Sequence, residues 1–260
     1  MGSTLSAQEI DQFIHQGFVK IENAFPENLA DAAKEILWRD MGCDPHDSRT
    51  WKQPVIRLGN YGQEPFRDAV NTPILLNAFK QLAGDNWVPR YSLGTFPVRF
   101  PSAEDPADTG WHVDASFPGD NPNDYLSWRI NIYSRGRALL MLFLFSDVDE
   151  AHAPTKIIPA SHLDVARILT DAGDNGLSAL ELAQQLKIEG QPQILATGKT
   201  GTVYLCHPFL VHAAQPNRGS SPRFLAQPPL IAPNPFAVFE NKEEYCPVEV
   251  AIRVGLGMES

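Results

Sequence analysis

The chain has 260 residues, a formal net charge of -10 and a hydrophobic content of 43%. This length and composition fit one large domain with a sizeable core, and they argue against disorder. The acidic balance without a basic stripe argues against nucleic acid as a partner, and no apolar run approaches the roughly 20 residues that a membrane span needs. Cys43, Cys206 and Cys246 lack metal-type spacing, which is typical of a reduced, cytoplasmic protein.

The first part of the chain is predicted to be mainly helical, over about residues 5–85. Ser6 and Glu9 form a capping-box pattern ahead of apolar residues at helical spacing, and Gly17 is expected to end this helix. The other elements expected in this part are one strand and two helices, at residues 18–21, 26–39 and 72–83.

The sequence changes character at residue 88, where short apolar runs broken by Pro, Gly and Asn begin. Many short strands at close spacing predict a sandwich or barrel of the jelly-roll kind, with its core over about residues 88–254. A helical insertion at about 162–187 lies inside this core, so we expect a single domain over residues 1–260. The predicted strands are 88–99, 110–117, 127–133, 137–146, 154–158, 193–196, 201–206, 210–213, 223–231 and 247–254.

A His-x-Asp pair, His112 and Asp114, lies within one of these predicted strands. Residues two apart in a strand point to the same face, so both side chains can reach one metal ion. His212 can supply a third ligand from a distant strand. Two histidines and one carboxylate make the facial triad of non-haem Fe(II) oxygenases, which leaves coordination positions open for a co-substrate and for O2.

Arg223 follows His212 by eleven residues. A planar guanidinium can hold a carboxylate through two parallel charge-assisted hydrogen bonds, which a lysine cannot do. We therefore expect Arg223 to bind the far carboxylate of a 2-oxo acid co-substrate.

Three segments resemble the phytanoyl-CoA dioxygenase family. Residues 137–162 are similar to its apolar strand, acidic turn and Pro-Gly-Ser-His segment, and residues 201–223 to its distal histidine motif. The helix that begins at Ser6 resembles its N-terminus, so the resemblance covers roughly residues 5–231. It implies a mainly β fold with flanking helices, a cupin-like double-stranded β-helix. It also implies that His112, Asp114 and His212 bind Fe(II) and that Arg223 binds 2-oxoglutarate.

The resemblance also distinguishes the two distal histidines, because the family's ligand is the second histidine of the His-x4-His pair. His212 is therefore the expected ligand, and His207 is read as a strand-end histidine packed under Pro208.

The sequence departs from the family pattern at three places. Ala160 and the pair His152-Ala153 stand where the family usually has Gly and Asn-Gly. Ala214 stands where some members have a serine that assists the co-substrate carboxylate. A hydroxyl from elsewhere would then complete that site, and Thr95 and Thr155 are the candidates; the alternative is that both are ordinary strand threonines.

These features predict an Fe(II)- and 2-oxoglutarate-dependent oxygenase that uses O2 to oxidise a C–H bond of a small metabolite or natural-product intermediate. Two alternatives stay open: a cupin-type metalloenzyme that needs no 2-oxoglutarate, and a non-catalytic jelly-roll module that binds a ligand. The polar residues after the His-x-Asp motif either line the mouth of a substrate pocket or are solvated; among them are Arg129, Asn131, Arg135 and Arg137. The sequence leaves the oligomeric state open, a homodimer included.

Overall fold

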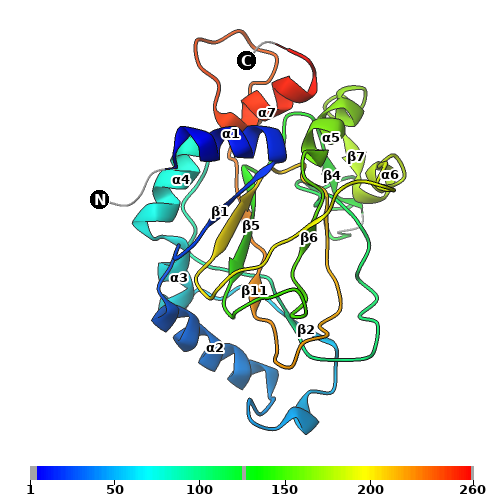
Figure 1. The fold of residues 1–260 in the computed structure, drawn as a ribbon. Helices are drawn as coiled ribbons and strands as arrows, with labels where there is room; N and C mark the ends of the chain where they lie inside the picture. Colours follow the sequence, from blue (N-terminus) through cyan, green and yellow to red (C-terminus); the bar gives the residue numbers. More distant parts are fainter. Residues whose placement is uncertain (1–4, 125–126, 259–260) are drawn as a thin grey trace.

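The computed structural model describes residues 5–124 and 127–258. Helices α1 to α4 come first in the chain, and three more helices follow among and after the strands (Figure 1). The helices are α1 (Ala7–Gln16), α2 (Glu27–Met41), α3 (Glu64–Val70), α4 (Pro73–Ala83), α5 (Ser161–Thr170), α6 (Ala179–Ala183) and α7 (Pro247–Gly255), with a 3-10 turn at Ser48–Thr50.

Two antiparallel sheets form the centre of the structure. The larger sheet has the order β1 (Phe18–Ile21), β9 (Val203–Cys206), β5 (Leu139–Leu144) and β11 (Leu225–Ala226), and β12 (Pro229–Leu230) also pairs with β5. The smaller sheet has the order β10 (His212–Ala213), β6 (Lys156–Ile157) and β8 (Ile194–Leu195). Two further pairs join β2 (Val55–Leu58) to β3 (Phe96–Arg99), and β4 (Arg129–Ile130) to β7 (Leu177–Ser178).

Strand β5 is buried on both faces, and its side chains alternate between two hydrophobic clusters. Leu139, Met141 and Phe143 belong to the cluster that also contains the buried residues of the N-terminal helices. Leu140, Leu142 and Leu144 belong to a second cluster, which includes Ile157 of β6 and Leu225 of β11. Because this second cluster joins the larger sheet to the smaller one, it marks the interior between the two sheets, and we call it the inner cluster.

The helices cover the outside of the larger sheet and one end of the structure (Figure 1). Helices α2, α3 and α4 follow one another along the flank, and α7 contacts α1, α4 and α5 at the end. Helix α1 begins with the predicted capping box, in which Ser6 accepts from the backbone N–H of Glu9, and it ends at Gly17 in the left-handed conformation. No helix in the described part of the chain is long and apolar enough to cross a membrane.

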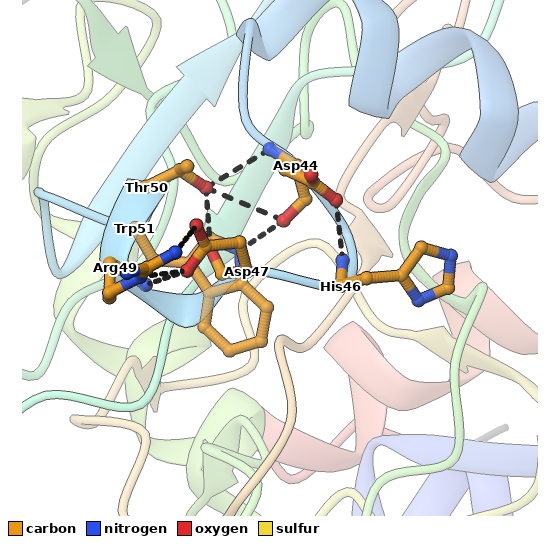
Figure 2. Close-up of polar contacts among 6 residues, drawn as sticks. All are labelled: Asp44, His46, Asp47, Arg49, Thr50 and Trp51. Atoms are coloured by element: carbon orange, nitrogen blue, oxygen red, sulfur yellow. Dashed lines mark hydrogen bonds and ion pairs between the residues drawn. The ribbon is translucent and has the colours of Figure 1, made fainter.

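A hydrogen-bonded loop connects α2 to β2 (Figure 2). Asp47 caps the 3-10 turn and pairs with Arg49, while the indole N–H of Trp51 donates to the carbonyl of Asp44 at 2.9 Å. This loop places the ring of Trp51 against Trp38 of α2 and against Phe100 beside β3. The aromatic contacts fix β3, which carries one of the residues discussed below.

Several predicted strands are shorter than expected, one is reduced to single bridges, and one is a helix instead. Residues 247–254 form helix α7, because Val248, Ala251, Ile252 and Gly255 are buried at helical spacing. Residues 88–99 contribute a strand only at Phe96–Arg99. Residues 110–117 form no regular strand, and instead pair through single bridges at His112 and Phe117. The segment predicted as a helical insertion contains α5 and α6, with β7 between them.

Candidate metal centre

His112 and His212 lie directly opposite each other on neighbouring backbone segments. Each backbone N–H donates to the other residue's carbonyl at 3.0 Å, so the two form one antiparallel bridge. Side chains that face each other across such a pair lie on the same face, and the two imidazole ring centroids are 4.4 Å apart. This bridge brings together residues that are a hundred positions apart in the sequence.

Asp114 completes a cluster of three metal-ligating side chains. One ligand atom from each of His112, Asp114 and His212 lies within 4.8 Å of the others. Oδ1 of Asp114 is 3.6 Å from Nε2 of His112 and 3.7 Å from Nε2 of His212. Nδ1 of His112 is bonded to the carbonyl of Gly110 at 2.8 Å, and Nδ1 of His212 to that of Leu210 at 3.0 Å. These bonds fix the tautomers so that both Nε2 lone pairs face the carboxylate.

The second oxygen of Asp114 is held by Arg137. Nη1 of Arg137 donates to Oδ2 of Asp114 at 2.7 Å, and Nη2 donates to the carbonyl of Ala115 at 2.9 Å. Burial alone would raise the pKa of Asp114, but the Arg137 guanidinium and the two histidines hold it well below the usual value. The carboxylate is therefore ionised, with Oδ1 left for a metal ion.

The two histidines have different electrostatic surroundings. Burial, reinforced by the neighbouring His112, lowers the pKa of His212 to about 4. Burial also acts to lower the pKa of His112, but its interactions with Asp114 outweigh this and raise it. At neutral pH His212 is thus neutral, which is the form that binds a metal ion.

Gln227 is a further residue of the site, which the sequence reasoning missed. Its side-chain nitrogen lies 3.1 Å from Nε2 of His212. Because Nδ1 of His212 donates to Leu210, Nε2 is the acceptor of this bond. The backbone N–H of Gln227 also donates to the carbonyl of Thr95. A glutamine side chain therefore occupies the position from which a metal ion would approach His212.

Arg223 points into the interior between the sheets. It lies two residues before Leu225 on an extended segment, and Leu225 belongs to the inner cluster, so both side chains face the same way. Nη1 of Arg223 donates to the carbonyl of Ala153 at 2.6 Å and Nη2 to that of Pro97 at 3.0 Å. Burial, with the nearby Arg99, lowers the pKa of Arg223 to about 9. Among the described residues its Nε has no hydrogen-bond partner.

A family model described as phytanoyl-CoA dioxygenase (PhyH) matches residues 13–225. The chain belongs to the phytanoyl-CoA dioxygenase family. No curated protein sequence matches it at a significant level.

Solved structures of similar fold include α-ketoglutarate-dependent enzymes of nogalamycin biosynthesis. SnoK, an α-ketoglutarate-dependent carbocyclase from nogalamycin biosynthesis, is 18% identical with a TM-score of 0.59, over 89% of this chain and 87% of SnoK. HygX from Streptomyces hygroscopicus, with nickel, 2-oxoglutarate and hygromycin B bound, is 16% identical with a TM-score of 0.55, over 86% of each chain. The epimerase SnoN, in complex with Fe3+, α-ketoglutarate and nogalamycin RO, is 17% identical with a TM-score of 0.55, over 85% of this chain and 80% of SnoN. These likenesses confirm the predicted double-stranded β-helix.

Thr95 and Thr155, the two candidates for a hydroxyl at the co-substrate carboxylate, lie in different surroundings. Thr155 is buried and lies two residues before Ile157. Ile157 belongs to the inner cluster and pairs with His212 across the β6–β10 ladder. The side chain of Thr155 therefore points into the interior, as that of Arg223 does. Thr95 has an exposed side chain, and it approaches the site through its backbone carbonyl, which accepts from Gln227. The geometry favours Thr155 over Thr95 as a neighbour of a ligand in the interior.

His207, which the family resemblance ranks below His212, is fully buried with both ring nitrogens engaged. Nε2 is bonded to the carbonyl of Val248, and Nδ1 accepts from the backbone N–H of Phe209. The ring packs against His162 with centroids 4.9 Å apart. His207 is thus a packing residue between the sheet and α7, and it offers no free lone pair to a metal ion.

The family's usual glycine positions keep a glycine-like backbone here although alanine occupies them. Ala153 has φ 49 and Ala160 has φ 64, both in the left-handed region. The carbonyl of Ala153 accepts from Arg223, and the N–H of Ala160 donates to Gln16 of α1. Both alanines therefore adopt a backbone conformation that favours glycine, at a steric cost.

Several polar residues after the His-x-Asp motif bind backbone carbonyls, and Asn131 and Arg135 also line a surface pocket next to Phe236. Arg129 donates to the carbonyls of Asn175 and Gly176, and Asn131 donates to that of Asp174. Arg135 lies over the ring of Phe117, 5.2 Å from its centroid. Of this group, Arg137 is the residue that contacts the triad, and the sequence gave no signal that distinguishes it from Arg135.

Proposed function

We propose that this chain is an Fe(II)- and 2-oxoglutarate-dependent oxygenase. The observation that carries the proposal is the cluster of His112, Asp114 and His212, in which both imidazoles are oriented by carbonyls and the carboxylate is oriented by Arg137. Two imidazoles and one carboxylate are the donor set of non-haem Fe(II) oxygenases. Side chains that are already oriented in this way need little rearrangement to bind an ion.

Each member of the cluster has a defined role in the proposal. His112 and His212 bind Fe(II) through Nε2 and Asp114 binds it through Oδ1, while Arg137 keeps Asp114 ionised. Bound Fe(II) and 2-oxoglutarate supply the activation of O2, with oxidative decarboxylation of the 2-oxo acid to succinate and CO2.

Arg223 anchors the distal carboxylate of 2-oxoglutarate in this proposal, with the buried Thr155 beside it. An isolated guanidinium in a buried interior is costly unless an anion pairs with it. A metalloenzyme that needs no 2-oxo acid has no use for such a residue. Arg223 therefore favours the 2-oxoglutarate-dependent reading over a co-substrate-independent cupin-type enzyme and over a non-catalytic ligand-binding module.

The exposure of the three ligands indicates the direction from which substrate approaches. The side chain of His112 is 38% exposed, that of Asp114 18% and that of His212 2%. The site is thus closed on the side of His212 and open on the side of His112. We infer that substrate enters over His112, while the 2-oxo acid lies on the buried side, which keeps water from the reacting atoms.

The substrate class that we propose is a small metabolite or a natural-product intermediate, oxidised at a C–H bond. SnoK is from nogalamycin biosynthesis, and HygX was solved with hygromycin B. Because SnoK is a carbocyclase and SnoN an epimerase, ring closure or epimerisation stands beside hydroxylation as the outcome.

We further propose that the chain acts as one domain. The N-terminal helices and strand β5 contribute to a single hydrophobic cluster, in which Phe13 and Leu37 of the helices pack with Met141 of the strand. A site on the strands would then depend on the helices for its stability.

The test is anaerobic reconstitution with Fe(II), followed by addition of 2-oxoglutarate. We expect a weak visible charge-transfer band, and succinate release on exposure to O2. The variant Asp114→Ala should lose both, whereas Arg135→Ala, a nearby arginine outside the triad, should retain both. Absence of band and succinate from the unaltered, folded protein would contradict the proposed function.

A further inference from the structure

Arg99 and Arg223 form a buried pair of guanidiniums on the inside of the barrel. Arg99 ends β3, and its backbone N–H donates to the carbonyl of Arg223 at 3.1 Å, while that of Arg223 donates back at 2.8 Å. Residues that exchange both bonds lie directly opposite each other, so their side chains share one face. Both side chains are 2% exposed.

Within residues 5–124 and 127–258, the pair has fewer anionic partners than it has charges. Nη2 of Arg99 donates to Oδ2 of Asp108 at 2.7 Å. Arg223 donates to two backbone carbonyls, which are neutral. Asp108 is also shared with Arg57, whose side chain is 59% exposed. Two buried guanidiniums with a single shared carboxylate leave at least one positive charge without a counter-ion, which is costly in an interior.

Unpartnered donors lie on both members of the pair. Nε and Nη1 of Arg99 and Nε of Arg223 are buried, and none has a hydrogen-bond partner in the described part of the chain. Oδ1 of Asp108 is also without one. Buried N–H groups of this kind normally have an acceptor. A monoanionic carboxylate supplies both the missing charge and the missing acceptor.

We propose that Arg99 is a second guanidinium for the distal carboxylate of the co-substrate, acting together with Arg223, and that Asp108 limits the positive charge of the pair. This inference rests on the proposed function, because it takes the 2-oxo acid as the ligand. It assigns a residue on β3, far from the distal motif in the sequence, to co-substrate binding. A cation, Arg99, then contributes to the anchor that the missing serine at Ala214 leaves open, in addition to the hydroxyl of Thr155.

The experiment compares two co-substrates that differ only at the distal end. 2-Oxopentanoate has the chain length of 2-oxoglutarate, but it carries a methyl group in place of the distal carboxylate. The Kd of each is measured by anaerobic calorimetry on the Ni(II)-loaded protein, which binds without turnover. The ratio of the two Kd values isolates the contribution of the distal carboxylate.

We expect Arg99→Met to reduce the preference for 2-oxoglutarate by about tenfold or more, the size expected for the loss of a hydrogen bond to a charged group. The Kd of 2-oxopentanoate should change little. Arg135→Met, which removes an arginine that lies over the ring of Phe117 and outside the pair, should leave the preference unchanged. Asp108→Asn should strengthen it, because Arg99 loses its competing carboxylate.

The outcomes separate this inference from the function on which it rests. If the unaltered protein binds both compounds equally, or neither, the proposed function fails. If it prefers 2-oxoglutarate and Arg99→Met keeps that preference, the assignment of Arg99 fails. If Arg99→Met weakens the affinity for both compounds equally, the assignment also fails, because such a loss would indicate a structural role for Arg99. If Arg99→Met does not fold, Asp108→Asn decides: an unchanged or weaker preference overturns the assignment.

Discussion

The side-chain nitrogen of Gln227 lies 3.1 Å from Nε2 of His212, on the lone pair that faces the metal centre. Nδ1 of the same ring donates to the carbonyl of Leu210, so the amide of Gln227 is the donor of the bond. A metal ion and this amide cannot use one lone pair together. Gln227 therefore has to move aside when a metal ion binds.

We predict that Gln227→Met tightens metal binding by about fivefold. Metal binding to the unaltered protein breaks the hydrogen bond between Gln227 and His212, which costs about 1 kcal/mol, and the variant has no such bond to break. The Kd for Mn(II) or Ni(II), measured by calorimetry, checks this. Gln215→Met is the matched control, because its amide donates to the carbonyl of Pro154 and should not affect the metal. Weaker metal binding in Gln227→Met would mean that Gln227 supports the ligand set.

The ion pair between Arg137 and Asp114 leads to a second prediction. Arg137→Met removes the cation that contributes most to lowering the pKa of Asp114, so that pKa should rise. Protons then compete with the metal ion at higher pH than in the unaltered protein. We expect metal affinity to fall by about 10- to 100-fold, as for other residues that orient metal ligands, and to fall further as the pH is lowered.

The measurement for Arg137→Met is the metal Kd at two pH values, with Arg135→Met as the control. Arg135 lies over Phe117, and its replacement should leave the metal Kd unchanged at both pH values. An Arg137→Met protein with unaltered affinity and pH dependence would show that Asp114 needs no partner to stay ionised.

The cluster of His112, Asp114 and His212 could be proposed from the sequence because part of its pattern is local. His112 and Asp114 are two residues apart, and the resemblance to a known family placed His212 and Arg223. Helix α1 was predicted for a similar reason, since its capping box and its terminal glycine lie within the helix's own sequence.

Residues that depend on tertiary contacts could not be predicted in this way. Gln227 and Arg99 reach the site only through strand pairing, which the spacing of residue types does not specify. Helix α7 was predicted as a strand because its β-branched residues alternate. Only two of them, Val248 and Ile252, are buried; together with Ala251 and Gly255 they follow helical spacing, and packing against α1, α4 and α5 determines the helix.

A third prediction concerns acid stability. Burial lowers the pKa of His162 from 6.5 to about 4 in the folded protein. As pH falls below 6.5 the unfolded chain takes up a proton that folded His162 does not, so the free energy of unfolding decreases until about pH 4. By linkage, the free energy of unfolding falls by about 3 kcal/mol between pH 6.5 and about pH 4. At neutral pH none of this stability has been lost.

His162→Gln tests this, because the glutamine amide can still donate to the carbonyl of Ile14, to which Nε2 of His162 is bonded at 2.9 Å. Urea unfolding of the metal-free protein at pH 7 and pH 5 should show a smaller difference for this variant than for the unaltered chain. The exposed His46→Gln is the control. Equal pH dependence in all three proteins would show that His162 is not the group responsible.

The last prediction concerns Ala160, which precedes α5 with φ 64 where the family usually has glycine. An L-residue in this conformation costs about 1–2 kcal/mol, and glycine avoids that cost while losing about 0.5–1 kcal/mol of chain entropy. Ala160→Gly should therefore raise the free energy of unfolding by up to about 1 kcal/mol. Ala32→Gly, at an exposed position within α2, should lower it by about the same amount. Urea unfolding distinguishes the two signs, and a loss of stability in both variants would mean that the backbone at Ala160 is held by its bond to Gln16 rather than strained.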